Sequence, residues 1–401
     1  MIRKKYWLFM MATCLTALSL NPLATLAKEP PKIQSEAAIL IDGNTGQVLF
    51  EKNSDQEMYP ASITKIVTAI MAIESGDLDD SVTVSAKARN VDGTRVYLEE
   101  GETVLLEKLV KGMLVNSGND AAIAIAEHVS GSVESFAQDM NEFMKNKVGV
   151  ENSHFVNPNG LFDEGHVTTA SDMAKITQYA MKNEKFRSLI GIKELDWTVE
   201  DWDTTLVNHH RLLLDYDFVT GGKNGYVSES GFTLVTTAKK DDHDLIVVTM
   251  KANDDQISYQ DTLSLLNYGF NEFSPVVYKE ETELGESDGE KYSLTKDLTL
   301  YQKSGAEATL SVTENGTLKS TVGSIQSNLD RDFLSIIPVE EEGPVEVSEA
   351  KPAVQVKDDD TESLLSSKTI FFGGVGIFIS ILVVLFSSRS KSSRKRYRSF
   401  P

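Results

Sequence analysis

A serine and a lysine three positions apart, Ser62 and Lys65, have types and spacing that could do chemistry. A serine hydroxyl is a weak nucleophile until a base takes its proton. A lysine amine can be that base where burial or neighbouring cations lower its pKa. Residues at i and i+3 share one face of a helix, with Cβ atoms about 5–6 Å apart. The pair could therefore support nucleophilic catalysis, although so short a motif is often only a solvated surface pair.

The residues around this pair predict a helix. Apolar residues recur with a period near 3.6 from Ile63 to Ile70. Pro60 suits the first turn, where its missing N–H is not needed. Free N–H groups and the positive end of the helix dipole would also favour a developing oxyanion there.

Two further polar clusters could join the pair. Ser117-Gly118-Asn119 interrupts two helical patterns, so its hydroxyl and amide are expected to face out of a loop. Lys223-Asn224-Gly225 lies on an expected strand whose glycines let another backbone, such as a peptide substrate, come close. Taken singly, Ser117 could be only a helix cap and Lys223 only an exposed strand charge.

The elements that would position these clusters read as strands, then helices, then strands. Residues 36–51 predict a hairpin. Helical patterns follow at 105–115, 121–129, 132–147 and 171–183, then strand patterns at 218–227, 232–238 and 245–250, and a closing helix at 259–270. This order implies a sheet built from both ends of the domain, with a helical insertion between them.

The pattern changes near Ser274-Pro275. Residues 276–338 alternate apolar and polar positions, and Asn315-Gly316 is a hairpin signal, so we expect a small β-domain. Residues 340–368 combine acids and prolines with few aromatics, which predicts a flexible spacer.

Both ends of the chain indicate export and anchoring. Residues 1–27 have the basic start, apolar core and small-residue exit of a secretory signal. Thr369–Phe386 is an uncharged apolar run of 18 residues, at the short end for a membrane helix. A basic tail follows it, and the positive-inside rule puts that tail in the cytoplasm and the body of the protein outside.

Composition excludes several classes of protein. The chain has 401 residues, enough for two domains, and 41% of them are hydrophobic. The formal net charge is −21 despite two basic ends, so nucleic acid is not an expected partner. The one cysteine, Cys14, lies in the leader, and the six histidines lack metal-ligand spacing. We therefore expect no disulfide, metal or other cofactor.

The order S-x-x-K, S-x-N, K-x-G resembles that of the penicillin-binding proteins and serine β-lactamases. The closer resemblance is to the low-molecular-mass D-alanyl-D-alanine carboxypeptidases. It is carried by Ala61–Lys65, Ser117–Ala121, His154–Leu161 and His166–Met173. It covers about residues 33–270 strongly and the remainder of the chain more loosely.

The resemblance implies an α/β (α+β) fold with a transpeptidase-like domain, in which a helical subdomain accompanies an antiparallel sheet. A small all-β domain and a C-terminal transmembrane helix would follow. The expected parts are a signal peptide at 1–27, a catalytic domain at 28–274, a β-rich domain at 275–339, a spacer at 340–368, a membrane helix at 369–388 and a cytoplasmic tail at 389–401.

The resemblance also implies a role for each motif residue. Ser62 would be the acylated nucleophile and Lys65 its base, and Ser117 would relay a proton toward the leaving group. Asn119 would hold the substrate backbone. Lys223 would supply positive potential for the substrate carboxylate and help to keep Lys65 neutral.

The third motif would complete the substrate site. The residues that the resemblance implies for substrate binding are Asn119, Lys223, Asn224, Gly225 and Tyr226. The backbone N–H groups of Ser62 and Tyr226 would form the oxyanion hole.

Two departures from the family pattern concern the substrate carboxylate. Relatives usually have Thr or Ser where this chain has Asn224, and many carry Arg just before the Tyr of the closing helix, where this chain has Ser258 before Tyr259. An amide can still donate a hydrogen bond, but it is longer than a hydroxyl. We therefore expect an active enzyme with weaker carboxylate recognition.

The expected function is that of a serine-type D-Ala-D-Ala carboxypeptidase. It would remove the terminal D-alanine from peptidoglycan stem pentapeptides through an acyl-enzyme on Ser62, and β-lactams would acylate the same serine. The protein would be anchored in the cell membrane with its catalytic domain on the wall side of a Gram-positive-type cell, and the β-domain would set the height of the site.

Three alternative functions would use the same motifs. A class A β-lactamase needs a Glu with a nearby Leu-Asn between the second and third motifs, and no E-x-x-L-N occurs there. A DD-transpeptidase differs only in using an amine acceptor and stays open. So does a catalytically impaired surface protein that binds wall peptides.

Overall fold

The computed structural model describes residues 29–199, 202–329 and 331–337. Contacts divide the chain into two units, Met1–Glu340 and Glu341–Pro401, and all described residues belong to the first. Within the described ranges no helix is both long and apolar enough to cross a bilayer. The predicted signal peptide, spacer, membrane helix and cytoplasmic tail, at 1–27, 340–368, 369–388 and 389–401, lie outside these residues.

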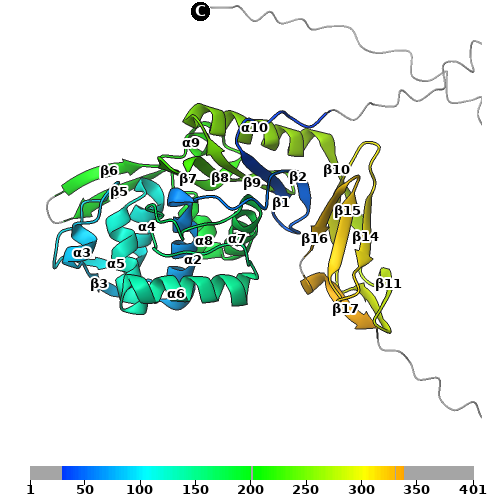
Figure 1. The fold of residues 1–401 in the computed structure, drawn as a ribbon, viewed down its shortest axis with the longest axis horizontal. Helices are drawn as coiled ribbons and strands as arrows, with labels where there is room; N and C mark the ends of the chain where they lie inside the picture. Colours follow the sequence, from blue (N-terminus) through cyan, green and yellow to red (C-terminus); the bar gives the residue numbers. More distant parts are fainter. Residues whose placement is uncertain (1–28, 200–201, 330, 338–401) are drawn as a thin grey trace, which may run out of the picture. The chain divides into compact units, whose positions relative to one another are not determined.

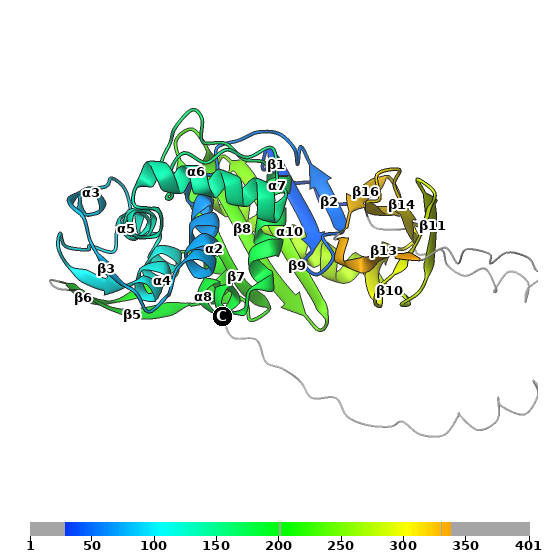
Figure 2. The same cartoon turned by 90° about the horizontal axis from the view of Figure 1, so that it is seen from below.

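A five-stranded antiparallel sheet is built from both ends of the predicted catalytic region, as its strand–helix–strand order predicted (Figure 2). Its strands, in spatial order, are β2 (Val48–Lys52), β1 (Ala37–Asp42), β9 (His243–Ala252), β8 (Gly231–Lys240) and β7 (Val219–Val227). Strand β1 pairs with β9 from Ala37 opposite Met250 to Asp42 opposite Leu245. Strand β7 is an edge strand, which leaves one side of its backbone open to a peptide.

The sheet is covered on both faces. Figure 1 shows α10 (Asp255–Glu272) on one face and α2 (Lys65–Ser75) and α7 (Ala170–Lys182) on the other. Every residue of β1 is buried, and alternate residues enter different cores, since Ile39 packs with the α2 side and Leu40 with the α10 side. This two-sided burial explains why β1 reads as an apolar run and not as an alternating pattern.

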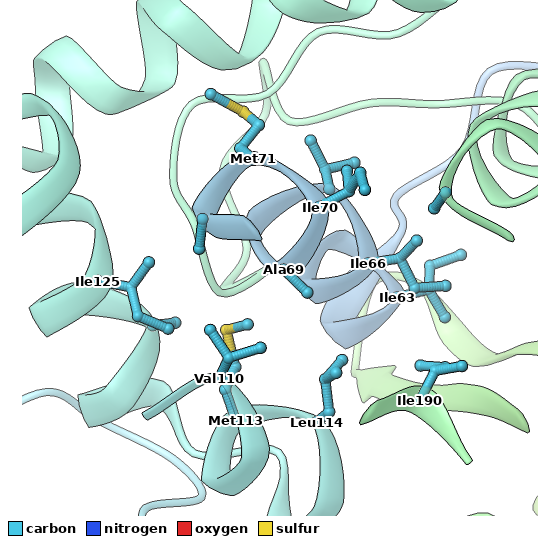
Figure 3. Packing of buried hydrophobic residues seen from close by; sticks show 14 of the residues in the cluster. Ile63, Ile66, Ala69, Ile70, Met71, Val110, Met113, Leu114, Ile125 and Ile190 are labelled. Atoms are coloured by element: carbon cyan, nitrogen blue, oxygen red, sulfur yellow. The ribbon is translucent and has the colours of Figure 1, made fainter. Parts of the chain in front are cut away.

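The helical insertion follows the predicted segments closely. It contains α4 (Leu106–Asn116), α5 (Asn119–Ser130), α6 (Val133–Phe143) with a wider turn at Met144–Val148, and α7. Helix α2 packs against it, with Ala69 facing Met113 and Leu114 of α4, whereas Ile70 and Met71 lie on the opposite side of α2 (Figure 3). The apolar period that predicted the Ser62 helix is therefore the buried face of α2 and of the turn before it.

Several short elements were not predicted. They are α3 (Ala86–Arg89), α8 (Glu184–Ile190), β5 (Glu194–Val199), β6 (Trp202–Val207) and α9 (Arg211–Asp215), whereas β3 (Ser81–Thr83) and β4 (Thr103–Leu105) lie within 81–107, where the sequence favours short strands and turns. Elements this short show no clear apolar period, and tertiary contacts stabilise them. The buried indole of Trp197, for example, fixes β5 by donating to the Val96 carbonyl at 3.0 Å.

The described residues after α10 form three small antiparallel sheets around a separate apolar core that includes Leu294, Leu300 and Leu318. The strands are β10 (Phe273–Tyr278), β11 (Glu283–Ser287), β12 (Glu290–Leu294), β13 (Leu298–Lys303), β14 (Ala308–Val312), β15 (Leu318–Val322), β16 (Ile325–Asn328) and β17 (Leu334–Ile337). Strands β14 and β15 form the hairpin predicted at Asn315-Gly316.

Side chains join this β-rich part to the five-stranded sheet. The Gln47 amide donates to the Tyr301 carbonyl at 2.7 Å and accepts from the Tyr301 N–H at 2.7 Å. The Val48 N–H donates to Ser327 Oγ at 2.7 Å. Edge strand β2 is thus tied to β13 and β16 through paired polar groups.

Candidate active site

Ser62 lies in a 3₁₀ turn, η1 (Ala61–Thr64), that leads directly into α2. Lys65 is the first residue of α2, and its Nζ lies 3.0 Å from Ser62 Oγ. The predicted proximity of the pair is therefore present, although the serine is in the tighter turn and not in the α-helix itself.

The Lys65 amine is fully buried among three oxygen atoms. Besides Ser62 Oγ, it contacts Asn119 Oδ1 at 2.8 Å and the Asn159 carbonyl at 2.6 Å. Burial holds the pKa of Lys65 well below 10.5, and the nearby Lys223 cation lowers it further, while Asp120 acts in the opposite direction.

The neighbours of the Lys65 amine determine how its hydrogens are arranged when it is neutral. An amide oxygen and a backbone carbonyl oxygen can only accept hydrogen bonds. The two hydrogens of the neutral Lys65 amine therefore go to Asn119 and Asn159. A charged Lys65 donates to Ser62 Oγ, but once the amine is neutral its lone pair faces the Ser62 hydroxyl, which is the arrangement that a general base requires.

Two glycines allow the backbone to close tightly around Ser62. Gly160 has φ +83°, and a Cβ there would lie 1.9 Å from the Ala61 carbonyl oxygen. A Cβ on Gly225 of β7 would lie 2.6 Å from the Ser62 amide nitrogen. Ala61 itself has φ 51°, in the left-handed region that non-glycine residues rarely adopt. The peptide before Ser62 is thus held between the 157–161 loop and β7.

The second motif lies between α4 and α5. Ser117 is 7% exposed with φ 62° and ψ 31°, and Asn119 is the first residue of α5. Ser117 is the residue that ends α4, in the left-handed conformation, so the helix-cap alternative holds for its backbone, whereas Gly118 precedes α5 without a side-chain cap. The contacts of Lys65 within the described chain do not include Ser117.

A neighbouring loop fixes the orientation of Asn119. Its Nδ2 donates to the Asp92 carbonyl at 2.7 Å, which leaves Oδ1 for Lys65. The adjacent buried Asp120 carboxylate accepts the backbone N–H groups of Val96 and Leu98. Burial raises the pKa of Asp120, and these backbone hydrogen bonds lower it.

The third motif lies on edge strand β7. Lys223 is 2% exposed, and its Nζ donates to the Asn224 carbonyl at 2.9 Å, so the exposed-charge alternative is wrong. Burial lowers the pKa of Lys223 to about 7. Tyr226 is exposed, and its ring packs on Phe232 with the centroids 4.6 Å apart.

Three contributors to the site were not predicted by number. Asn159 and Gly160 belong to an Asn-Pro-Asn-Gly turn signal that also carried the family resemblance. His166 contacts Thr64 Oγ1 at 2.8 Å through Nε2, while its Nδ1 accepts the Val156 N–H at 3.0 Å. Burial lowers the pKa of His166 to about 4, so the ring is neutral and its Nε2 carries the hydrogen.

A cavity of about 140 Å³ lies beside β7. Its lining includes His209, Arg211, Asn224, Tyr226, Ser258 and Tyr259. Arg211 comes from the short helix α9, which no periodic pattern predicted. The cavity therefore joins the third motif to both positions at which the chain departs from the family pattern.

The comparisons with known proteins agree with this geometry. The family model described as D-alanyl-D-alanine carboxypeptidase, Peptidase_S11, matches residues 24–254. The chain therefore belongs to the D-alanyl-D-alanine carboxypeptidase family of serine peptidases, which confirms the resemblance carried by its motifs.

Individual relatives give the extent of the similarity. The chain is 36% identical over 247 residues to D-alanyl-D-alanine carboxypeptidase DacF of Bacillus subtilis, a match that covers 60% of this chain and 63% of that one. It is 32% identical to DacD of Salmonella typhimurium, over 66% of this chain and 71% of that one. The structure of penicillin-binding protein 5 from Haemophilus influenzae is similar with a TM-score of 0.65 and 26% identity, covering 77% of this chain and 98% of that one. The fold is thus that of the penicillin-binding carboxypeptidases.

Proposed function

We propose that this protein is a serine-type D-Ala-D-Ala carboxypeptidase that releases the terminal D-alanine of peptidoglycan stem pentapeptides and is acylated by β-lactams. The observation that carries the proposal is the fully buried Lys65 amine, 3.0 Å from Ser62 Oγ, whose other two neighbours are hydrogen-bond acceptors. A buried neutral amine at hydrogen-bond distance can activate a serine.

In the proposed acylation, Lys65 takes the proton of Ser62 as Oγ attacks the carbonyl carbon of the scissile D-Ala-D-Ala bond. The N–H groups of Ser62 and Tyr226 stabilise the oxyanion, and the close approach of Gly225 to the Ser62 nitrogen supports this pairing. The C–N bond then breaks, and the leaving amine takes a proton by way of Ser117. Lys65 is the source of that proton.

In the proposed deacylation, a water molecule gives a proton to Lys65 and attacks the ester carbon. The C–O bond to Ser62 breaks, and Oγ recovers its proton. The shortened peptide leaves with a new carboxylate. Asn119 and Lys223 hold the substrate during both steps, and Asn224 and Gly225 line its path along the edge of β7.

We also propose the division of the chain inferred from its sequence. A signal peptide at 1–27 directs export, and the catalytic domain spans 28–274. The β-rich domain at 275–339 and the spacer at 340–368 set the site at a height above the membrane. A span at 369–388 then anchors the protein, with its body on the wall side and the 389–401 tail in the cytoplasm. The apolar run and the basic tail support this arrangement.

The test is release of D-alanine from a soluble peptide ending in Lys-D-Ala-D-Ala, with Ser62→Ala as the control. We expect release by the wild-type protein and none by the variant. Parallel reactions with an added amine acceptor separate hydrolysis from transpeptidation. A folded wild-type protein that releases no D-alanine and takes up no penicillin mass would instead be a wall-peptide-binding protein.

A further inference from the structure

A positively charged side chain that no sequence motif singles out lines the cavity beside β7. Arg211 lines it together with Asn224, Ser258 and Tyr259. The family resemblance implies an arginine at the position of Ser258, just before Tyr259 on α10. Arg211 thus brings a guanidinium to the same cavity from α9 instead of α10.

The other polar groups of the cavity are poor anchors for an anion. Ser258 is 3% exposed, and its hydroxyl donates to the Asp255 carbonyl at 2.7 Å. Lys223 is not among the lining residues, and the hydroxyl of Thr233, which is, donates to the Pro60 carbonyl at 2.8 Å. A guanidinium, in contrast, stays charged throughout the pH range in which proteins fold.

Local contacts hold Arg211 at the cavity. The hydroxyl of Tyr259 accepts the Arg211 N–H at 3.4 Å and donates to the His209 carbonyl at 3.1 Å. The guanidinium carbon lies 5.4 Å from the centroid of the Tyr259 ring. Tyr259 thus contacts Arg211 at two points: its hydroxyl fixes the backbone of Arg211, and its ring lies against the guanidinium.

The guanidinium has donors to spare. Within the described ranges its hydrogen-bond partner is Asp255, reached through Nη2 alone. Nη2 uses only one of its two hydrogens there, so a parallel pair of donors, from Nη2 together with Nε or with Nη1, remains for a ligand. A guanidinium can bind a planar carboxylate through two parallel hydrogen bonds while it keeps a second acidic partner.

We propose that Arg211 binds the C-terminal carboxylate of the peptide substrate in the cavity beside β7. This inference rests on the proposed function, because the carboxylate in question belongs to the D-alanine that leaves. Peptide bound along edge strand β7 would extend its last residue past Gly225 toward Asn224 and the cavity. The Asp255 ion pair keeps the guanidinium in position when the site is empty.

The test compares two peptides that end in D-Ala-D-Ala, one with a free carboxylate and one with a C-terminal amide. We expect Arg211→Gln to lower kcat/KM for the free acid by about 10- to 100-fold, the usual effect of losing a charge-assisted hydrogen bond. Turnover of the amide peptide should change by less than about twofold, because this peptide has no C-terminal carboxylate for Arg211 to bind. Ser258→Arg added to Arg211→Gln should restore turnover of the free acid.

The control is Arg187→Gln, which removes an arginine that pairs with Glu184 on α8, outside this cavity. Equal losses on acid and amide would show that Arg211 acts only through the fold and would overturn the proposal. An unchanged kcat/KM for the acid would overturn it as well.

Peptide affinity measured in the Ser62→Ala protein separates this inference from the proposed function. Arg211→Gln should weaken binding of the acid, but not of the amide, whether or not the wild-type protein turns over. Binding of the acid that does not depend on Arg211 would overturn the inference and leave the carboxypeptidase proposal intact.

Discussion

The backbone of Gly160 lies in close contact with the peptide bond that precedes Ser62, so Gly160→Ala should lower both the free energy of unfolding and the rate of acylation. The new Cβ would lie 1.9 Å from the Ala61 oxygen, whereas real Cβ contacts lie above 3.0 Å. The Ala61–Ser62 peptide must therefore move by about 1 Å, and a displacement of that size can cost about 100-fold in rate.

The stability change has two parts that a matched control can separate. A left-handed conformation costs a non-glycine residue about 1–2 kcal/mol, and overpacking costs about 1–3 kcal/mol. Gly101 has the same φ of +83° with nothing within 4 Å of an added Cβ. Gly101→Ala should therefore lose only the first part, and Gly160→Ala should lose about 2–5 kcal/mol in all.

Urea unfolding measures the stability of both variants, and stopped-flow acylation by a chromogenic β-lactam measures the site. We expect Gly101→Ala to be acylated at the wild-type rate and Gly160→Ala to be about 100-fold slower. If the two variants were equally stable and acylated equally fast, contact with Gly160 would not position Ser62.

Three further predictions concern charge and hydrogen bonding. Burial raises the pKa of Asp42 to about 6 from 3.8, so ionising it costs the folded state about 3 kcal/mol, a cost that grows as pH rises from about 4 to about 6. Asp42→Asn should therefore raise the melting temperature at pH 8 but not below pH 4, and equal shifts at both pH values would contradict this. Asp120→Asn replaces one of the two oxygen atoms that accept the Val96 and Leu98 N–H groups by an NH₂ donor. It should lower the free energy of unfolding by about 1–3 kcal/mol, measured in urea. An unchanged urea midpoint would show that these hydrogen bonds are dispensable. Asn224→Thr should lower KM for the free-acid peptide, because it restores the hydroxyl of the family pattern; unchanged turnover and penicillin acylation would show that Asn224 does not weaken carboxylate recognition.

Local patterns in the sequence predicted the parts of this site that lie close together along the chain. The Ser62–Lys65 contact follows from helical spacing, and the buried face of α2 follows from the period of its apolar residues. The two-ended sheet was predictable because β1 and β9 are both apolar runs of strand-forming residues.

Contacts between distant residues were not predictable in the same way. Lys65 finds its two other partners 54 and 94 residues away, at Asn119 and Asn159, and no local pattern encodes that pairing. Arg211 reaches the cavity from a five-residue helix too short to show a period. The burial of Lys223 was also missed, because lysine on a strand is ordinarily exposed.

The most direct test of the account is intact-mass analysis after benzylpenicillin treatment, followed by peptide mapping of the adduct. We expect one penicilloyl group per chain, on the peptide that contains Ser62, no adduct in Ser62→Ala, and much slower formation in Lys65→Gln. A lower pH should also slow the reaction, because the depressed pKa of Lys65 must stay below the working pH for its lone pair to be free. An adduct on another residue, or wild-type acylation without the Lys65 amine, would contradict activation of Ser62 by Lys65.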